Sequence, residues 1–275
     1  MSLIHLASRG VVRVAGPDAL TFLNGLVTND VESAYRNVSI YAAMLTPQGK
    51  FLYDMMIVSP SPNIFLLDVP RVSDFIKRLS MYKLRAQVTI EDMSEDLHVY
   101  QTFDEEPSPR GGHIAADPRL MELGHRMIIQ DFWGDKEEVD YHAHCLELGV
   151  PDPARDLLVE KDFVMEGLFD EFEAIDFHKG CYVGQEMTSR MKRRTSVKNK
   201  LCRVRFEGGA PDFETPILAD GWEVGRMRSG IEGVGIAMIR FDRARKAIDS
   251  GQVLMAGDVE ITLDPPDWLV QPELT

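Results

Sequence analysis

The chain has 275 residues, of which 44% are hydrophobic and 27% charged, a composition that excludes a long disordered or low-complexity protein. Its formal net charge of −14 opposes approach to phosphate backbones, so we expect no bulk nucleic-acid binding. No stretch of about 18 apolar residues occurs, and we therefore expect no membrane partner.

The first 90 residues alternate between strand-like and helix-like periods. The segment 71–82 places Val72, Phe75, Ile76 and Leu79 on one helical face and predicts a helix. A second, shorter helix is expected at 17–26, where Pro17 and Asp18 suit a first turn. Strands are expected at 10–16, with Val12 and Val14 on one face, at 39–59 as a hairpin turning at Pro47-Gln48-Gly49, at 63–69 and at 86–92.

The second half of the chain changes character twice. Residues 104–118 are rich in proline, glycine and charge and predict a loop or linker. A strand is expected at 126–133 and a helix at 136–149, ended by Gly149. After residue 198, short strands at turn-punctuated intervals predict a small antiparallel barrel. We therefore divide the chain into an α+β region, 1–197, which the linker would split into two subdomains, and a β-barrel domain, 198–275.

The chain has three cysteines, Cys145, Cys181 and Cys202. Because they are few and odd in number, they argue against a disulfide framework. The first ten residues have neither the apolar core of a signal peptide nor the Arg- and Ser-rich character of a transit peptide. We therefore expect a reducing compartment and a cytoplasmic protein.

The stretch FHKGCYVGQEMTSRMKRR, residues 177–194, combines a thiol, a carboxylate and a basic run. A helix opening at Gly184 would place Cys181 just before a helix N-terminus, where the dipole, with Lys179 and the more distant Arg190, favours a thiolate. Gly180 and Gly184 would permit positive φ angles and close backbone approach. Two plainer interpretations stand beside these: a lone cysteine is often a buried small hydrophobe, and a basic run often a solvated helix end.

Within this stretch, KGCYVGQE resembles the K-G-C-[FY]-x-G-Q-E signature of the YgfZ-type folate-binding proteins, which are relatives of the glycine-cleavage T-protein, an aminomethyltransferase. Residues 9–31, 45–58 and 146–152 resemble further segments of that family, so that the likeness spans about residues 8–195. The resemblance implies an α+β, T-protein-like folate-binding fold with a C-terminal antiparallel β-barrel. It also implies tetrahydrofolate, or a one-carbon derivative of it, as cofactor.

The resemblance also carries over site residues. Glu147 matches the family's pterin-binding glutamate, because a carboxylate can accept two parallel N–H bonds from a pterin edge, although Cys145 replaces the preceding arginine. Without the family, Glu147 would be interpreted as an exposed helix acid. Arg190 and the basic residues after it would receive the folate's glutamyl tail, or dock an acidic partner or a tRNA segment. The signature supplies the remaining cofactor-binding candidates: Lys179, Gly180, Tyr182, Gln185 and Glu186.

The T-protein's paired aspartates are replaced here by Tyr53 and Asp54, which must point to opposite faces of a strand. The sequence leaves open which of the two faces the pterin, and it makes Cys181 and Asp54 the catalytic candidates. A short HAHC run, residues 142–145, gives two facing ligands at most, and we expect no metal site.

Three hypotheses of function follow from the resemblance. The first is a tetrahydrofolate-binding accessory protein for iron–sulfur cluster assembly or repair, which includes the maturation of tRNA-modifying iron–sulfur enzymes. It would work as a monomer with iron–sulfur enzymes or assembly proteins as partners. The second is an aminomethyltransferase that transfers a one-carbon unit to tetrahydrofolate, with Asp54 as its carboxylate. The third is a non-enzymatic scaffold that folate merely stabilises.

Overall fold

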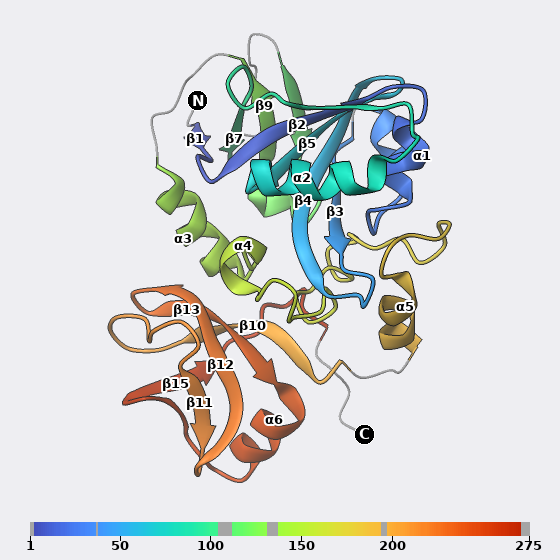
Figure 1. The fold of residues 1–275 in the computed structure, drawn as a ribbon. Coiled ribbons are helices and arrows are strands. Elements are labelled where there is room, and N and C mark those ends of the chain that lie inside the picture. Colours follow the sequence, from blue (N-terminus) through green and yellow to red (C-terminus); the bar gives the residue numbers. More distant parts are fainter. Residues whose placement is uncertain (1–2, 37, 104–111, 131–136, 194–196, 271–275) are drawn as a thin grey trace. The chain divides into compact units, whose positions relative to one another are not determined.

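The computed structural model describes residues 3–36, 38–103, 112–130, 137–193 and 197–270 (Figure 1). The chain forms two compact units, each from two segments. The first unit comprises residues 1–141 and 172–185, and the second comprises 142–171 and 186–275. The cysteine signature, residues 179–186, thus lies in the first unit except for its last residue, Glu186.

The first unit is built on a five-stranded antiparallel sheet in the order β3-β4-β5-β2-β6. The predicted hairpin is confirmed, because β3 and β4 pair with Ala43 opposite Asp54, and Gly49 turns between them with a φ of 78°. The strands expected in this part of the chain are likewise confirmed. Their bounds are β2 Arg9–Ala15, β3 Ile40–Leu45, β4 Phe51–Ser61, β5 Ile64–Pro70 and β6 Thr89–Asp92.

One face of this sheet packs against α2, Val72–Lys83, which Figure 1 shows lying across the strands. The predicted helical stripe is confirmed, since Phe75 and Leu79 are completely buried in the core beneath α2. Val12 and Val14 point into the same core, as the strand period predicts. The short α1, Ala19–Asn24, and the 3-10 helix η1, Val31–Arg36, complete this layer.

A second, four-stranded antiparallel sheet, in the order β1-β7-β9-β8, belongs to the same unit. A smaller core joins the two sheets, with Val11 and Leu66 of the larger sheet packed with Val99 and Ile128 of the smaller one. The bounds of its elements are β1 Ile4–His5, β7 His98–Thr102, β8 His113–Ala116, η2 Met121–Leu123 and β9 His125–Ile129.

The segment 104–118, expected as a loop or linker, contains strand β8, which is hydrogen-bonded to β9. Its residues are half-exposed or exposed and follow a run of prolines and glycines, so no apolar alternation marks them as a strand. Residues 104–111 lie outside the described part of the chain, as do residues 131–133 at the end of the strand expected at 126–133.

Two further helices each contain a point where the chain passes from one unit to the other. The helix expected at 136–149 is α3, Glu138–Leu148, and Gly149 follows its last residue with a φ of 73°, the left-handed conformation that commonly ends helices. The helix expected to open at Gly184 is α5, Gln185–Arg193. Between them lies the short α4, Pro153–Asp156, whose N-cap Asp152 accepts a hydrogen bond from the Ala154 amide at 3.0 Å.

The second unit contains a closed antiparallel barrel in the order β10-β13-β12-β11-β14-β15, which confirms the expected fold of this part of the chain. The helix α6, Phe241–Asp249, which follows β13, was missed. Its signal was the three-residue spacing of the buried Phe241, Ala244 and Ala247. The strand bounds are β10 Asn199–Arg205, β11 Pro216–Ala219, β12 Trp222–Ile231, β13 Val234–Arg240, β14 Leu254–Ala256 and β15 Val259–Leu263.

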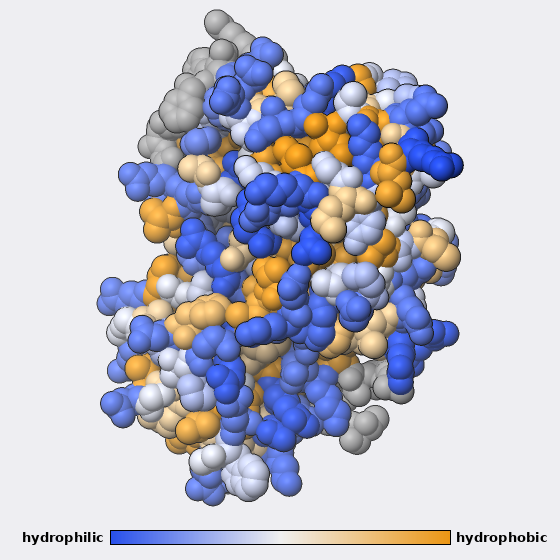
Figure 2. Space-filling view, viewed as in Figure 1, coloured by the Kyte–Doolittle hydropathy of each residue, from blue (hydrophilic) through white to orange (hydrophobic). Residues whose placement is uncertain are grey.

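The surface has the mixed character that the composition predicts. Figure 2 shows hydrophilic side chains over much of the face in view, with apolar side chains between them in smaller groups. In the part of the chain that the structure describes, no helix combines the length and the apolar character needed to cross a membrane.

Candidate functional site

The signature cysteine lies on an irregular segment between residues 172 and 184, which runs into α5. Cys181 is exposed, whereas Cys145 and Cys202 are buried, with exposed fractions of 3% and 1%. Burial raises the pKa of the Cys202 thiol to about 12, so that thiol stays protonated and unreactive. Cys181 is therefore the one cysteine of the three that a partner or a reagent can reach.

Lys179, two residues before Cys181, fastens this segment to the loop after α1. Its ammonium group donates hydrogen bonds to the Val27 carbonyl at 2.9 Å, the Asn29 carbonyl at 2.5 Å and Asn24 Oδ1 at 3.1 Å. Burial lowers the pKa of Lys179 to about 8, although the carboxylates of Asp30 and Asp176 act in the opposite direction. Lys179 thus holds two segments together that lie about 150 residues apart in the sequence.

Thr28 and Asn29, for which no role was predicted, also hold the segment that carries Cys181. The Thr28 hydroxyl donates to the Ala174 carbonyl at 2.7 Å and accepts from the Ala43 amide at 2.8 Å. The Asn29 side-chain amide donates to the Glu173 carbonyl at 2.9 Å and to the Tyr41 carbonyl at 2.8 Å. The sequence signal for this role was the Thr-Asn-Asp run that follows an apolar helix. The side chains of this run are completely or partly buried, and buried polar groups need hydrogen-bond partners.

The two glycines of the signature differ. Gly184 has a φ of 87°, and a Cβ on it would come within 2.7 Å of the Thr46 carbonyl oxygen, so its predicted positive φ and close approach are confirmed. Gly180 has no positive φ, and a Cβ there would meet nothing within 4 Å. The close approach of a ligand or of another chain to Gly180 stays a prediction. Gly180 is exposed beside Cys181, where no neighbouring backbone requires a glycine.

The other signature residues divide between the two units. Tyr182 is buried, and its ring lies 5.4 Å from the Lys179 ammonium group. Gln185 is half-buried at the start of α5 and is the last residue of the first unit. Glu186 and Arg190 are exposed on α5 and belong to the second unit. The signature thus contributes anchoring side chains to the first unit and the exposed carboxylate of Glu186 to the second, and Arg190 follows it in the basic run.

Part of the basic run expected to receive a folate tail is already paired with carboxylates of the second unit. Lys192 lies 3.4 Å from Asp170, Lys198 lies 3.6 Å from Asp242, and Lys200 forms a buried ion pair with Glu171. These partners compensate the charges of Lys192, Lys198 and Lys200 within the run.

Tyr53 and Asp54 point to opposite faces of β4, as expected for neighbours on a strand. Tyr53 lies in the core under α2, where its ring meets Phe75 edge-on at 5.2 Å. Asp54 points to the other face, where its Oδ2 accepts a hydrogen bond from Arg9 at 3.0 Å and lies 3.5 Å from the Tyr41 hydroxyl. Its side chain is only 3% exposed, so Asp54 is a buried, ion-paired acid.

Glu147 lies on α3 in the second unit and is paired with Arg205 of β10. Arg205 donates to both carboxylate oxygens of Glu147, at 2.8 and 3.2 Å. This hydrogen bonding lowers the pKa of Glu147. Arg203 also donates to the Glu147 carbonyl. Arg205 therefore already uses one acceptor site on each oxygen of Glu147, and a pterin at this carboxylate would compete with a guanidinium group.

Comparisons with known proteins connect these features to a family. The "GCVT N-terminal domain" model matches residues 1–102, and the "CAF17, C-terminal beta-barrel domain" model matches residues 198–271. A similar relative is "Iron-sulfur cluster assembly factor IBA57, mitochondrial" of Mus musculus, which is 30% identical over 96% of this chain and 84% of its own length. The homologue from Mycosarcoma maydis is 28% identical, covering 97% of this chain and 83% of its own length.

A solved structure is similar over almost the whole chain. The glycine cleavage system aminomethyltransferase T from Bartonella henselae matches with a TM-score of 0.75, covering 99% of this chain and 87% of its own. At 12% sequence identity this likeness shows the fold alone. The expected T-protein-like fold with a C-terminal barrel is thereby confirmed.

The expected cytoplasmic location was wrong, because the similar relatives are mitochondrial proteins. The expectation rested on the sparse cysteines and on the first ten residues. A cysteine count reports the redox state of a compartment and not which compartment it is.

Proposed function

We propose that this chain, which belongs to the family of IBA57 iron–sulfur cluster assembly factors, assists in the assembly of iron–sulfur clusters and uses Cys181 as its contact with the cluster. The observation that carries the proposal is the exposed thiol of Cys181 on a segment that Lys179 fixes to the body of the first unit. Iron–sulfur clusters are held by cysteine thiolates, so an accessible, positioned thiol is the chemical group that this task needs.

One thiol cannot hold a cluster by itself. In the part of the chain that the structure describes, no group of three His, Cys, Asp or Glu side chains is arranged to hold a metal ion. The two other cysteines are buried and offer no ligands. We therefore propose that a partner protein supplies the remaining ligands, and that Cys181 ligates the cluster as a cargo shared between the two proteins.

The test compares Cys181→Ser with a control that removes a buried thiol, Cys202→Ala. The purified proteins are mixed anaerobically with a scaffold protein that carries a [2Fe–2S] cluster, and visible circular dichroism follows the cysteinate-to-iron bands. We expect a changed spectrum with the native protein and the control, and none with Cys181→Ser. In cells that lack the native protein, Cys181→Ser should fail to restore iron–sulfur enzyme activity. Full rescue by Cys181→Ser would overturn the proposal.

Tetrahydrofolate, which the T-protein fold implies, does not fit the carboxylates that this chain presents. Glu147 is occupied by Arg205, and Asp54 is buried against Arg9. We therefore derive no step through folate, and neither carboxylate supports aminomethyl transfer. The expected result is that tetrahydrofolate gives no saturable thermal shift with the native protein. A shift that Glu147→Gln abolishes would show that Glu147 exchanges Arg205 for the pterin.

A narrower form of the proposal assigns tRNA-modifying iron–sulfur enzymes as clients. It is supported by the resemblance of KGCYVGQE to the YgfZ-type signature alone. The discriminating measurement is the level of thiolated tRNA beside the activity of an unrelated iron–sulfur enzyme in the same deficient cells. Loss of the first with the second intact supports the narrower form, and equal loss of both supports a general assembly role.

A further inference from the structure

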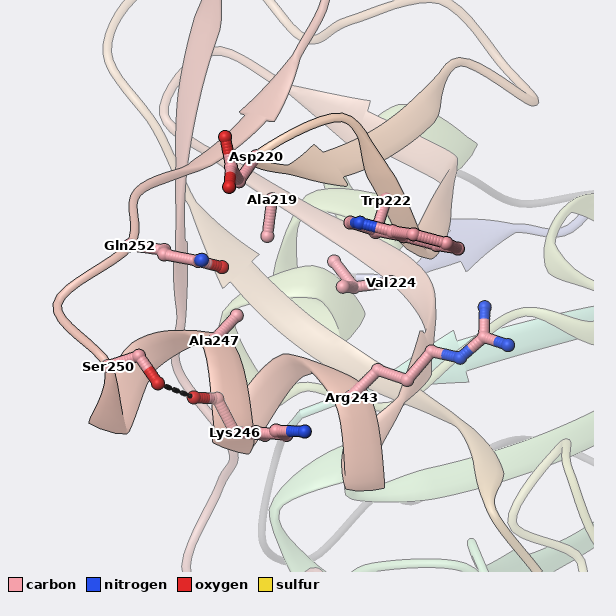
Figure 3. A pocket seen from close by; sticks show the side chains of 9 residues that line it. All are labelled: Ala219, Asp220, Trp222, Val224, Arg243, Lys246, Ala247, Ser250 and Gln252. Carbon is pink, nitrogen blue, oxygen red and sulfur yellow. Dashed lines mark hydrogen bonds between the residues drawn. The ribbon is translucent and has the colours of Figure 1, made fainter.

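The barrel carries a cavity of about 410 Å³ that the proposed function does not use. It lies between α6 and the turn that joins β11 to β12, as Figure 3 shows. Its size falls within the range of about 300–1,000 Å³ that is typical of sites for small molecules. All its lining residues belong to the second unit, so the cavity is a property of that unit alone.

The floor of the cavity is apolar and one wall is aromatic. Ala219, Val224 and Ala247 form the floor and are at most 7% exposed. Trp222 lines the cavity and is 74% exposed. A tryptophan that serves the core buries its ring, whereas Trp222 presents most of its surface to solvent. An indole beside an apolar floor offers a stacking surface for a flat ring.

Two cations stand on the same side of the cavity. Arg243 and Lys246 are three residues apart on α6 and therefore share one face of this helix. Among the described residues, neither side chain has a carboxylate within ion-pair distance, and the Arg243 guanidinium group donates to the Glu223 carbonyl at 3.1 Å. Arg243 also lies in the first turn of α6, where the helix dipole favours an anion.

A smaller adjoining cavity of about 280 Å³ shares Val224 and Arg243 with the first. Its other guanidinium groups are compensated, because Arg226 pairs with Glu223 at 2.7 Å and Arg240 with Asp242 at 3.0 Å. The uncompensated positive charge is thus concentrated on the side that Arg243 and Lys246 form. The chain as a whole has a net charge of −14, so this side of the cavity is a local positive patch on an acidic protein, and it suits an anionic ligand.

The opposite end of the cavity carries two side chains with oxygen atoms that can accept hydrogen bonds, Asp220 and Gln252. Figure 3 shows Asp220 and Gln252 on the side away from Arg243. The Asp220 carboxylate has no hydrogen bond or ion pair within the described part of the chain, and the Asp220 backbone turns into β12 with a φ of 47°. A carboxylate beside an amide can accept N–H donors from the edge of a heteroaromatic ring.

We propose that this cavity binds a purine nucleotide. The base would stack on Trp222, its N–H edge would face Asp220 and Gln252, and its phosphates would lie at Arg243 and Lys246. This ligand class combines a flat ring, a donor edge and an anionic end in one molecule. An acidic peptide would match the cations but would place its charge against Asp220 and leave the indole without a flat partner. The site is independent of Cys181, so either proposal can fail alone.

The test uses GDP as the probe, with guanosine and pyrophosphate as its separated halves. Binding to the full chain is followed by calorimetry and by quenching of tryptophan fluorescence. Because stacking and phosphate contacts both contribute, we expect GDP to bind about tenfold more tightly than either half. Trp222→Leu should remove the quenching and weaken GDP binding while leaving pyrophosphate binding unchanged.

The matched pair of variants is Arg243→Ala and Arg245→Ala, which remove the same charge from the same helix, one inside the cavity and one outside it. We expect Arg243→Ala to weaken GDP binding about threefold, and its combination with Lys246→Ala to weaken it about tenfold, since exposed ion pairs contribute up to about 1 kcal/mol each. Arg245→Ala should have no effect. Any of three results would overturn the proposal. These are equal affinities for GDP and pyrophosphate, equal effects of the two matched variants, and tighter binding of a polyglutamate peptide than of GDP.

Discussion

Replacing Lys179 by methionine tests whether this side chain holds the cysteine segment in place. Methionine keeps the length of the apolar stem but removes the ammonium group that donates to Val27, Asn29 and Asn24. The substitution removes three charge-assisted hydrogen bonds and leaves two backbone carbonyl groups without this donor. The loss in stability is partly offset, because the cost of burying the ammonium charge disappears as well. We estimate a net loss of about 2–4 kcal/mol in the free energy of opening this segment.

The assay is limited chymotrypsin cleavage after Tyr182, whose ring is 7% exposed in the native protein. A loss of about 2 kcal/mol raises the population of the open segment about 30-fold, and cleavage should accelerate by the same factor when opening is fast. Lys77→Met is the control, since Lys77 is exposed on α2 and its side chain is 79% accessible. Equal cleavage rates and equal unfolding free energies for the two variants would refute the anchoring role of Lys179.

Three further outcomes follow from the structure. Gly184→Ala should lower the free energy of unfolding by about 1–3 kcal/mol, because its positive φ and the nearby Thr46 carbonyl oppose a Cβ, and urea titration should show almost no change for Gly180→Ala. Iodoacetamide should label Cys181 in the native protein and Cys202 only after unfolding, as peptide mass spectrometry can measure; equal native rates would contradict the burial. Burial raises the pKa of Asp156 to about 6, above its unfolded value, so its stabilising contribution is present at low pH and lost as the pH rises through 6. Relative to Asp156→Asn, the unfolding free energy of the native protein should fall by about 2 kcal/mol between pH 4 and pH 7, and parallel profiles would contradict this.

The proposed role in cluster assembly and the fold's likeness to an aminomethyltransferase are compatible, because a fold can keep its architecture while its site changes. Here the carboxylates that would serve folate have protein partners, whereas the signature thiol stays exposed.

The elements that could be predicted from the amino-acid sequence are those whose signals are local. The stripe on α2, the hairpin turn at Gly49, the end of α3 at Gly149 and the strands of the barrel all follow from periodicity or from turn residues within one short window. The family resemblance added the overall fold and drew attention to Cys181. The elements that were missed include strand β8, which has no apolar alternation, and helix α6, which is short.

The tertiary structure alone decided what each site residue does. Lys179 finds its acceptors about 150 residues away, and Glu147 meets Arg205 across 58 residues of sequence. Whether Asp54 or Tyr53 faces the core depends on which side of the sheet α2 covers, and strand alternation cannot supply that information. Periodicity describes one element at a time, whereas burial, ion pairing and exposure arise only when distant elements pack together.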